Sequence, residues 1–279
     1  MSDFKKKKKY GQNFLTSVAI PQKIVAQSEI DKSFGVLEIG AGKGILTEEL
    51  AKNAAFVVAV EIDNDLIDFL KDKFAPYQNV VIINSDILQT DINEIIKKYF
   101  TGLKTAVCAN IPYYITSPII MQLLEGGYGF DFITVMVQKE VAARLLSKKG
   151  ESEYGAITVV CNYYARIKKL FNVSAGCFSP PPKVDSAVIK FDLYKIPPVH
   201  PENKTLFFSL IKAAFAQRRK IFSNSIQSCL NKPFTKEEIC GILTKVGFDI
   251  NVRGEALDIY DFTKISDIIN KHKTEDFLQ

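Results

Sequence analysis

The sequence has no tryptophan, and only two histidines and five cysteines among its 279 residues. His200 lies in a proline-rich segment and His272 near the C-terminus, so neither belongs to a motif. A mechanism that needs a histidine base, such as that of most triad hydrolases, is therefore not expected. The cysteines form no CxxC pair and have no histidine at ligand spacing, which argues against a metal site and indicates thiols in a reducing compartment.

Two further absences concern location. Charged residues interrupt the apolar runs, which are too short to span a bilayer. The lysines at residues 5–9 are not followed by the apolar stretch of a secretory signal. We therefore expect a cytoplasmic protein with no membrane partner.

Hydrophobic residues make up 47% of the chain, which is enough for a sizeable core. The formal net charge is +5, and basic residues gather in two clusters, at residues 5–9 and at Arg218, Arg219 and Lys220. A run of charge is usually only a solvated surface. Two such clusters also suit a polyanionic partner.

Short apolar segments typical of β-strands alternate with helical patterns in the first half of the chain. We expect strands at residues 36–39, 56–62, 80–84, 105–109 and 132–137, and helices at 17–28, 45–52, 66–74, 92–99, 118–124 and 140–147. The near-continuous apolar character of residues 56–62 is typical of a parallel strand buried on both faces. This alternation predicts a doubly wound, Rossmann-like α/β sheet that binds ligands at the carboxyl ends of its strands.

The later part of the chain has a different pattern. Two β segments, residues 166–173 and 186–193, are followed by a proline-rich linker at 196–201. Helical patterns come after it, at residues 206–217, 223–230, 236–246 and 262–270. We therefore expect an α/β domain with a basic tail over residues 1–196, and a smaller helical domain over residues 197–279.

A glycine-rich stretch, Gly40 to Gly44, joins the first expected strand to its helix and allows a ligand to approach the backbone closely. Glu61 follows Gly40 by 21 residues and ends the second strand, where a carboxylate can accept both hydroxyls of a ribose. A dinucleotide fingerprint would need Gly or Ala at Ile45, so that match fails. The glycine spacing is that of S-adenosylmethionine (SAM) methyltransferases, in which Asp86 would accept a hydrogen bond from the adenine amino group. A glycine turn beside two surface acids is the structural alternative.

The stretch Asn110-Ile111-Pro112-Tyr113 ends another expected strand. It resembles the (D/N/S)PPY motif of methyltransferases that act on amino nitrogens. There, the Asn110 side-chain oxygen and the Ile111 carbonyl would accept hydrogen bonds from an exocyclic amine. Pro112 would stiffen the loop and Tyr113 would offer a face on which a base can stack. A capped turn with a packed tyrosine is the alternative reading of the same residues.

Further motifs extend this resemblance over the chain from about residue 9 to residue 270: GQNFL at residues 11–15, QKEVA at 138–142, FSPPPKVDSAV at 178–188, FAQRRK at 215–220 and RGE at 253–255. Together they are similar to motifs of the small-subunit ribosomal RNA adenine-N6,N6-dimethyltransferases, the KsgA family. The chain has Ile111 where that family often has leucine, and it differs at Gly254 and Ala256 beside the Arg-x-Glu motif.

The resemblance implies roles for individual residues. The SAM pocket would be lined by Asn13, Leu15, Gly40, Gly42, Glu61, Ile62, Asp86, Ile87 and Asn110. Phe178 would stack on the target adenine opposite Tyr113. The basic cluster at residues 218–220 and the lysine tail would bind RNA phosphates without reading bases.

The implied reaction transfers methyl groups from SAM to N6 of two adjacent adenines near the 3′ end of small-subunit ribosomal RNA, twice on each adenine, during subunit maturation. It needs no strong base, which agrees with the scarcity of histidine. We expect a monomer that acts on the assembled small subunit. The alternatives are a large-subunit methyltransferase of the macrolide-resistance type and a non-catalytic RNA-binding assembly factor on the same fold. The stretch at 178–185 and the second domain favour the KsgA family.

Overall fold

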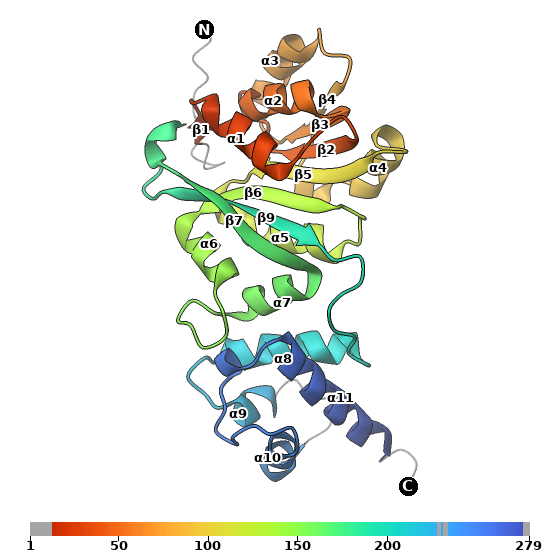
Figure 1. Ribbon diagram of the computed structural model, residues 1–279, viewed down its shortest axis with the longest axis vertical. Helices are drawn as coiled ribbons and strands as arrows, with labels where there is room; N and C mark the ends of the chain where they lie inside the picture. The colour runs from red at the N-terminus through yellow and green to blue at the C-terminus, as the bar shows by residue number, and fades with distance from the viewer. Residues whose placement is uncertain (1–12, 228–229, 231–233, 276–279) are drawn as a thin grey trace. The chain divides into compact units, whose positions relative to one another are not determined.

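The protein is described by a computed structural model that covers residues 13–227, 230 and 234–275 (Figure 1). The lysine cluster at residues 5–9 and Cys229 lie outside these described residues. By internal packing the chain divides into two units, the first made of the residues up to Ala142 together with Arg166–Lys195. The second comprises Ala143–Ala165 and the residues from Ile196 onward, so the segment at 143–165 packs with the C-terminal helices.

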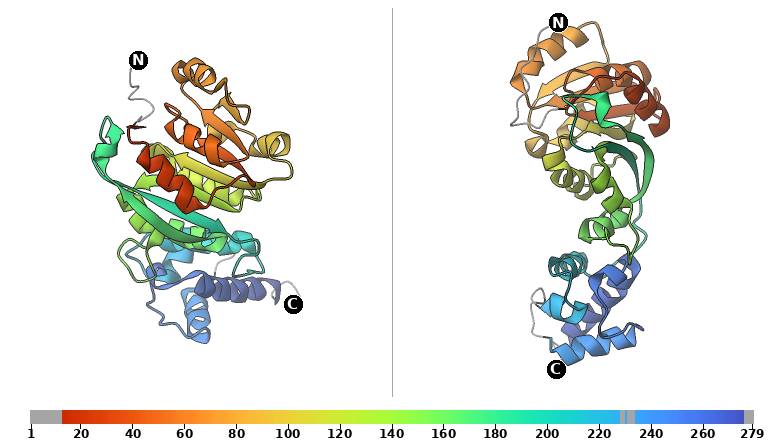
Figure 2. Two further views of the ribbon diagram at one scale, coloured as in Figure 1. Left: turned by 45° about the horizontal axis from the view of Figure 1, so that its top comes forward. Right: turned by 90° about the vertical axis from the view of Figure 1, so that its left-hand side faces the viewer.

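The first unit contains a seven-stranded sheet in the order β4-β3-β2-β5-β6-β9-β7. Five of its strands are parallel: β2 (Phe34–Ile39), β3 (Phe56–Glu61), β4 (Val80–Asn84), β5 (Lys104–Asn110) and β6 (Phe132–Gln138). β9 (Ser186–Leu193) runs antiparallel beside β6, and β7 (Ala165–Val173) forms the edge (Figure 2). The predicted doubly wound α/β sheet is therefore confirmed.

Five helices of this unit alternate with the parallel strands: α1 (Ala19–Ser28), α2 (Ile45–Asn53), α3 (Asn64–Phe74), α4 (Ile92–Tyr99) and α5 (Thr116–Glu125). Side chains of α1 and α2 share a core cluster with residues of β2, β3, β5 and β6. Figure 1 shows these two helices in front of the sheet and α5 behind it. Asp63 caps the N-terminus of α3 and Asp91 that of α4, each by accepting a backbone N–H of the first turn.

A second, two-stranded sheet joins distant parts of the first unit. β1 (Phe14–Leu15) pairs antiparallel with β8 (Phe178–Ser179), so that Leu15 lies opposite Phe178. The backbone N–H and the hydroxyl of Thr16 both donate to the carbonyl of Cys177, at 2.9 and 3.0 Å. The N-terminal motif and the proline-rich loop are therefore one element in space.

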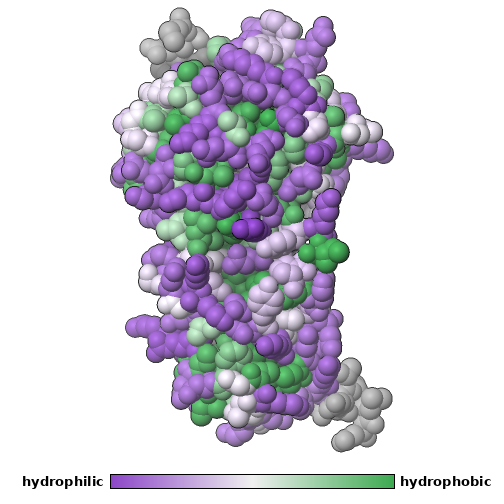
Figure 3. Space-filling model, in the orientation of Figure 1, coloured by the Kyte–Doolittle hydropathy of each residue, from purple (hydrophilic) through white to green (hydrophobic). Residues whose placement is uncertain are grey.

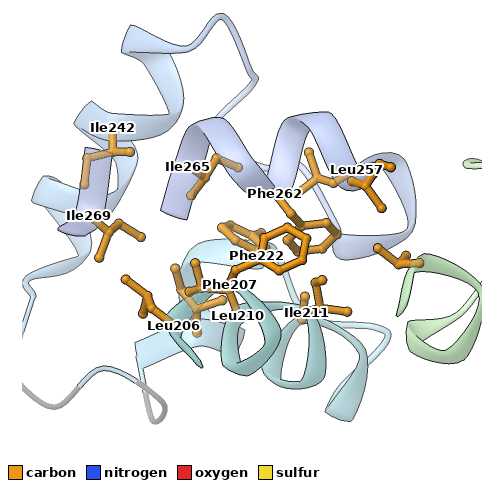
Figure 4. Packing of buried hydrophobic residues seen from close by; sticks show 14 of the residues in the cluster. Leu206, Phe207, Leu210, Ile211, Phe222, Ile242, Leu257, Phe262, Ile265 and Ile269 are labelled. Carbon is orange, nitrogen blue, oxygen red and sulfur yellow. The ribbon is translucent and has the colours of Figure 1, made fainter. Parts of the chain in front are cut away.

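The second unit is helical, with α7 (Ala156–Tyr164), α8 (Lys204–Ala216), α9 (Phe222–Ile226), α10 (Lys236–Lys245) and α11 (Ile259–Glu275). The helix α6 (Lys139–Leu146) contains the boundary between the two units. Figure 4 shows the core of the second unit, in which Phe207, Phe222 and Phe262 are fully buried. Burial of these rings together with the aliphatic side chains of the same cluster drives the unit to fold.

The surface visible in Figure 3 is largely hydrophilic, with hydrophobic residues in smaller areas between. Within the described part of the chain, no helix combines the length and the apolar character needed to cross a membrane.

Candidate functional site

A cavity of about 830 Å³, part of it open to solvent, lies at the carboxyl ends of β2, β3, β4 and β5. This is the edge at which open α/β sheets bind ligands. Its lining comprises Asn13, Phe14, Ile39, Gly40, Gly42, Val60, Glu61, Ile62, Ser85, Asp86, Ile87, Asn110, Ile111, Pro112, Tyr113, Tyr114, Ile115 and Ile119.

The turn after β2 depends on glycine. Gly40 and Gly42 have φ angles of +77° and +56°, which place both in the left-handed region. A Cβ atom at Gly42 would lie 3.2 Å from the ring of Phe14, and one at Gly40 would lie 3.4 Å from the carbonyl oxygen of Asn110. The backbone of this turn therefore adopts a conformation that favours glycine, and a ligand in the cavity can approach it closely.

Glu61, the last residue of β3, has its carboxylate fixed by two backbone donors. The N–H of Gly42 donates to Oε2 at 2.8 Å, and the N–H of Asp63 donates to Oε1 at 2.9 Å. Burial raises the pKa of this carboxyl above its usual value. Each carboxylate oxygen can accept about two hydrogen bonds, so each keeps capacity for one more donor from the cavity.

The segment after β4 supplies a second acid. Asp86 accepts the N–H of Leu88 through Oδ1 at 3.0 Å, which caps the short helix η2 (Ile87–Gln89). Ile87 is buried, whereas Ile62, which follows β3, is 39% exposed. Two isoleucines and one carboxylate on the same cavity wall suit a flat heteroaromatic ring that carries an amino group.

Asn110 ends β5, and its side chain has no hydrogen-bond partner among the residues that the structure describes. An amide that lines a cavity without such a partner is available to a ligand. Ile111 is 1% exposed, so its side chain belongs to the core and its peptide group is the part that can serve the cavity. The chain then turns through η3 (Tyr113–Ile115) into α5, and the Thr116 hydroxyl donates to the Tyr113 carbonyl at 3.2 Å.

The ring of Tyr113 is held at its far end. Its hydroxyl lies 2.7 Å from Oγ of Ser186, the first residue of β9. Burial raises the pKa of this phenol, so the group is neutral at physiological pH. A neutral ring that is fixed at both ends is suited to stacking.

Glu38 belongs to the site although sequence reasoning missed it. It lines a smaller cavity of about 310 Å³ that shares Phe14, Gly40 and Asn110 with the first. Its side chain is 1% exposed, and Oε2 has no hydrogen-bond partner among the described residues. Burial raises the pKa of Glu38 to about 8.

The structure thus brings most of the predicted site residues together. The residues found on the wall of the main cavity are Asn13, Gly40, Gly42, Glu61, Ile62, Asp86, Ile87, Asn110, Ile111, Pro112 and Tyr113. Leu15 lines the smaller cavity. The lining residues that were not predicted are Phe14, Ile39, Val60, Ser85, Tyr114, Ile115 and Ile119, and all of them except Ile115 and Ile119 directly adjoin predicted residues.

Phe178 is not on the wall of either cavity. Its pairing with Leu15 turns the ring into a core cluster of the first unit, where it is 4% exposed. Contact between this ring and a base, which the resemblance implies, stays a prediction.

The basic cluster lies in the second unit, in the turn after α8. Arg218 donates through Nε to Oε2 of Glu255 at 3.0 Å and also donates to the carbonyl of Ser152. Arg219 and Lys220 are exposed, and neither forms an ion pair with an acid in the described part of the chain. The three residues therefore differ in their contacts, because Arg218 alone forms an ion pair with Glu255 of the Arg-x-Glu segment.

A metal centre has no support in the described residues, where no three His, Cys, Asp or Glu side chains gather closely enough to hold an ion.

Known proteins are similar to this chain over most of its length. The family model "Ribosomal RNA adenine dimethylase" matches residues 3–271. A "Ribosomal RNA small subunit methyltransferase A" of Lachnoclostridium phytofermentans is 46% identical over 95% of this chain and 91% of its own. One of the same name from Staphylococcus haemolyticus is 45% identical over 94% and 89%.

Two solved structures resemble most of the chain. A dimethyladenosine transferase from Plasmodium falciparum gives a TM-score of 0.80 at 27% identity, covering 93% of this chain and 98% of its own. The 23S rRNA methyltransferase ErmE gives a TM-score of 0.70 at 24% identity, covering 92% and 100%. The second likeness is one of fold alone.

Proposed function

The chain belongs to the ribosomal RNA adenine dimethylase family, and from this premise we propose that it dimethylates two adjacent adenines near the 3′ end of small-subunit ribosomal RNA. It is a SAM-dependent methyltransferase that acts on adenine in ribosomal RNA. Relatives at 45–46% identity, whose names specify the small subunit, support the choice of subunit. The observation that carries the proposal is that the glycine turn, Glu61, Asp86 and the Asn110–Tyr113 stretch line one cavity.

When bound, SAM supplies an electrophilic methyl group on a positively charged sulfur. The residues present fit this cofactor. Glu61 would accept the two ribose hydroxyls with the capacity that its backbone donors leave free. Ile62 and Ile87 would flank the adenine while Asp86 accepts from its amino group. Gly40 and Gly42 let the backbone approach the methionine part closely.

Asn110 and its neighbours would prepare the acceptor. Adenine N6 is a weak nucleophile because its lone pair is delocalised into the ring. Hydrogen bonds from N6–H to Oδ1 of Asn110 and to the carbonyl of Ile111 would draw the nitrogen towards tetrahedral geometry and orient its lone pair. Tyr113 would hold the extruded base by stacking, worth roughly 1–3 kcal/mol. The catalytic contribution is then positioning and stabilisation of charge that develops on nitrogen.

Proton removal needs no dedicated base in this scheme. The methylated ammonium is acidic and loses its proton to water. The cavity wall agrees with this, since its titratable groups are Glu61, Asp86 and two tyrosines.

RNA docking would fall to the two basic clusters. Arg219 and Lys220 of the second unit, which are exposed, and the lysines at residues 5–9 would bind phosphates, and phosphate contacts need no base reading. Arg218 would support that turn through Glu255. We propose that the protein works as a monomer on the assembled small subunit.

The test uses ribosomal subunits from a strain that lacks the modification. With labelled SAM, the purified protein should methylate small subunits, and digestion followed by mass spectrometry should give N6,N6-dimethyladenosine at two neighbouring positions. Large subunits and protein-free large-subunit RNA serve as the matched controls and should stay unlabelled. Labelling of a single adenine confined to large-subunit RNA would support the macrolide-resistance alternative and overturn the choice of substrate. No labelling of either subunit by protein that binds SAM would favour an assembly factor.

A further inference from the structure

The hydrogen bond between Tyr113 and Ser186 joins two motifs that lie 73 residues apart in the sequence. Tyr113 belongs to the turn after β5, and Ser186 is the first residue of β9, where it pairs with Gln138 of β6. The Ser186 side chain is fully buried, and the distance of 2.7 Å is that of a well-formed O–H···O bond. One end of the proposed acceptor site thus depends on a residue outside the cavity wall.

Both supports of this bond are fixed by other contacts. Next to Ser186, the Asp185 carbonyl accepts the N–H of Lys139 at 3.0 Å, and the Asp185 carboxylate accepts the N–H of Ala175 at 3.0 Å. On the other side, the Thr116 hydroxyl donates to the carbonyls of Pro112 and Tyr113. The hydroxyl oxygen of a tyrosine lies on the axis about which the ring turns, so anchoring it between fixed backbones fixes the direction of that axis and hence the position of the ring.

We propose that Ser186 is a positioning residue for methyl transfer: its hydroxyl fixes the position of the Tyr113 ring and thereby the place at which a stacked adenine presents N6. The inference rests on the proposed function. Displacement of a reacting atom by about 1 Å can cost up to about 100-fold in rate, so a modest shift of the ring is enough to matter. Dimethylation makes the demand twice, because the monomethylated base must be presented again at the same place.

The experiment compares Ser186→Ala with Ser28→Ala. Ser28 is a fully buried serine of the same unit, and its hydroxyl donates to Thr134 Oγ1 at 2.9 Å. It lies outside both cavities described above, so Ser28→Ala removes a comparable buried hydrogen bond with no contact to the site. Both variants should lose similar thermal stability, whereas only Ser186→Ala should lose activity.

We expect Ser186→Ala to slow single-turnover methyl transfer to small subunits about 10-fold, as for the loss of one aligned hydrogen bond, and to raise the share of N6-methyladenosine among the products. SAM affinity should stay within about 2-fold. Tyr113→Phe should behave alike, and the double variant should be no slower than Tyr113→Phe, because both changes break one interaction. Ser28→Ala should match the wild type in rate and product ratio.

A Ser186→Ala protein with the wild-type rate and product ratio would overturn the inference, as would effects of the two changes that simply add. Carbon-13 labelling of tyrosine, with Tyr113 assigned from Tyr113→Phe, gives a readout that does not need activity. The Cζ carbon, which lies on the ring axis and does not move when the ring turns about that axis, should be fixed in the wild type and mobile in Ser186→Ala, and equal mobility in both would also overturn the inference. A wild-type protein that fails to methylate small subunits would contradict the proposed function instead, and the ring measurement would still decide whether Ser186 fixes Tyr113.

Discussion

Replacement of Glu38 by glutamine should change how stability depends on pH. Glu38 is 1% exposed, and Oε2 lacks a hydrogen-bond partner among the described residues. Its pKa of about 8 exceeds the value of 4.5 expected in the unfolded chain because burial disfavours the charged form. The folded protein therefore keeps this proton over a pH range in which the unfolded chain has released it.

The sign follows from proton binding. Between the two pKa values the folded state binds more protons than the unfolded state, so the free energy of unfolding falls as pH rises. At 1.36 kcal/mol per unit, the full difference between 4.5 and about 8 corresponds to roughly 5 kcal/mol. Of this, roughly 3 kcal/mol falls between pH 5 and pH 8. Glu38→Gln removes the titration, although its buried amide adds a cost that does not depend on pH.

The assay is urea unfolding followed by circular dichroism at several values between pH 5 and pH 8, without SAM. The stability of the wild type relative to Glu38→Gln should fall by roughly 3 kcal/mol across this range. Glu125→Gln is the matched control, because that carboxyl is exposed in the folded protein, and its curve should run parallel to the wild type. Parallel curves for Glu38→Gln and the wild type would refute the reasoning.

The remaining predictions concern the cavity and the second unit. Asn110→Ala should lower methyl transfer by at least about 100-fold with little change in SAM affinity, and equal losses in both would make Asn110 only a cofactor ligand. In calorimetry, Glu61→Gln should weaken SAM binding by about 1.5–3 kcal/mol, and unchanged affinity would contradict the ribose assignment. Gly254→Ala should destabilise the second unit by about 1–3 kcal/mol, measured by chemical denaturation, because its Cβ would lie 2.8 Å from that of Ala214; an unchanged midpoint would show that the packing yields. Arg219→Glu should weaken RNA binding and flatten its salt dependence by about one unit of slope, whereas lost stability with an intact slope would assign it to packing.

The sheet and most of the cavity wall were predictable because each depends on local patterns. Apolar strands that end on glycine, Glu61 or Asn110 indicate the carboxyl edge of a parallel sheet. That edge brings the residues at the strand ends together regardless of the conformation of the loops. In contrast, no helix was predicted at residues 156–164. Thr158, Val159 and Val160 are β-branched and favour strands by propensity, so only packing with the later helices of the second unit makes the segment helical.

Burial was the part of the site that the sequence could not supply. The resemblance implies that Phe178 stacks on the target adenine, but the sequence does not show that pairing of β8 with β1 buries its ring. The sequence does not distinguish Glu38 from the other acidic residues, and only the structure shows that its carboxyl is buried in the core. The bond from Tyr113 to Ser186 depends on the placement of β9 beside β6, which is a long-range choice of sheet order.

The discontinuous second unit has a consequence for synthesis. Tyr154, Val159 and Tyr163 belong to the same core cluster as Phe262 and Ile269, which are translated much later. At 5–20 residues per second, synthesis of about a hundred residues takes roughly 5–20 s. During this time α7 has been synthesised but the later residues of its core cluster have not. In a chain terminated after residue 196, α7 would never gain these apolar partners. We therefore expect chains stopped there to be held by chaperones or degraded, and a stable first unit to need deletion of residues 143–165 as well.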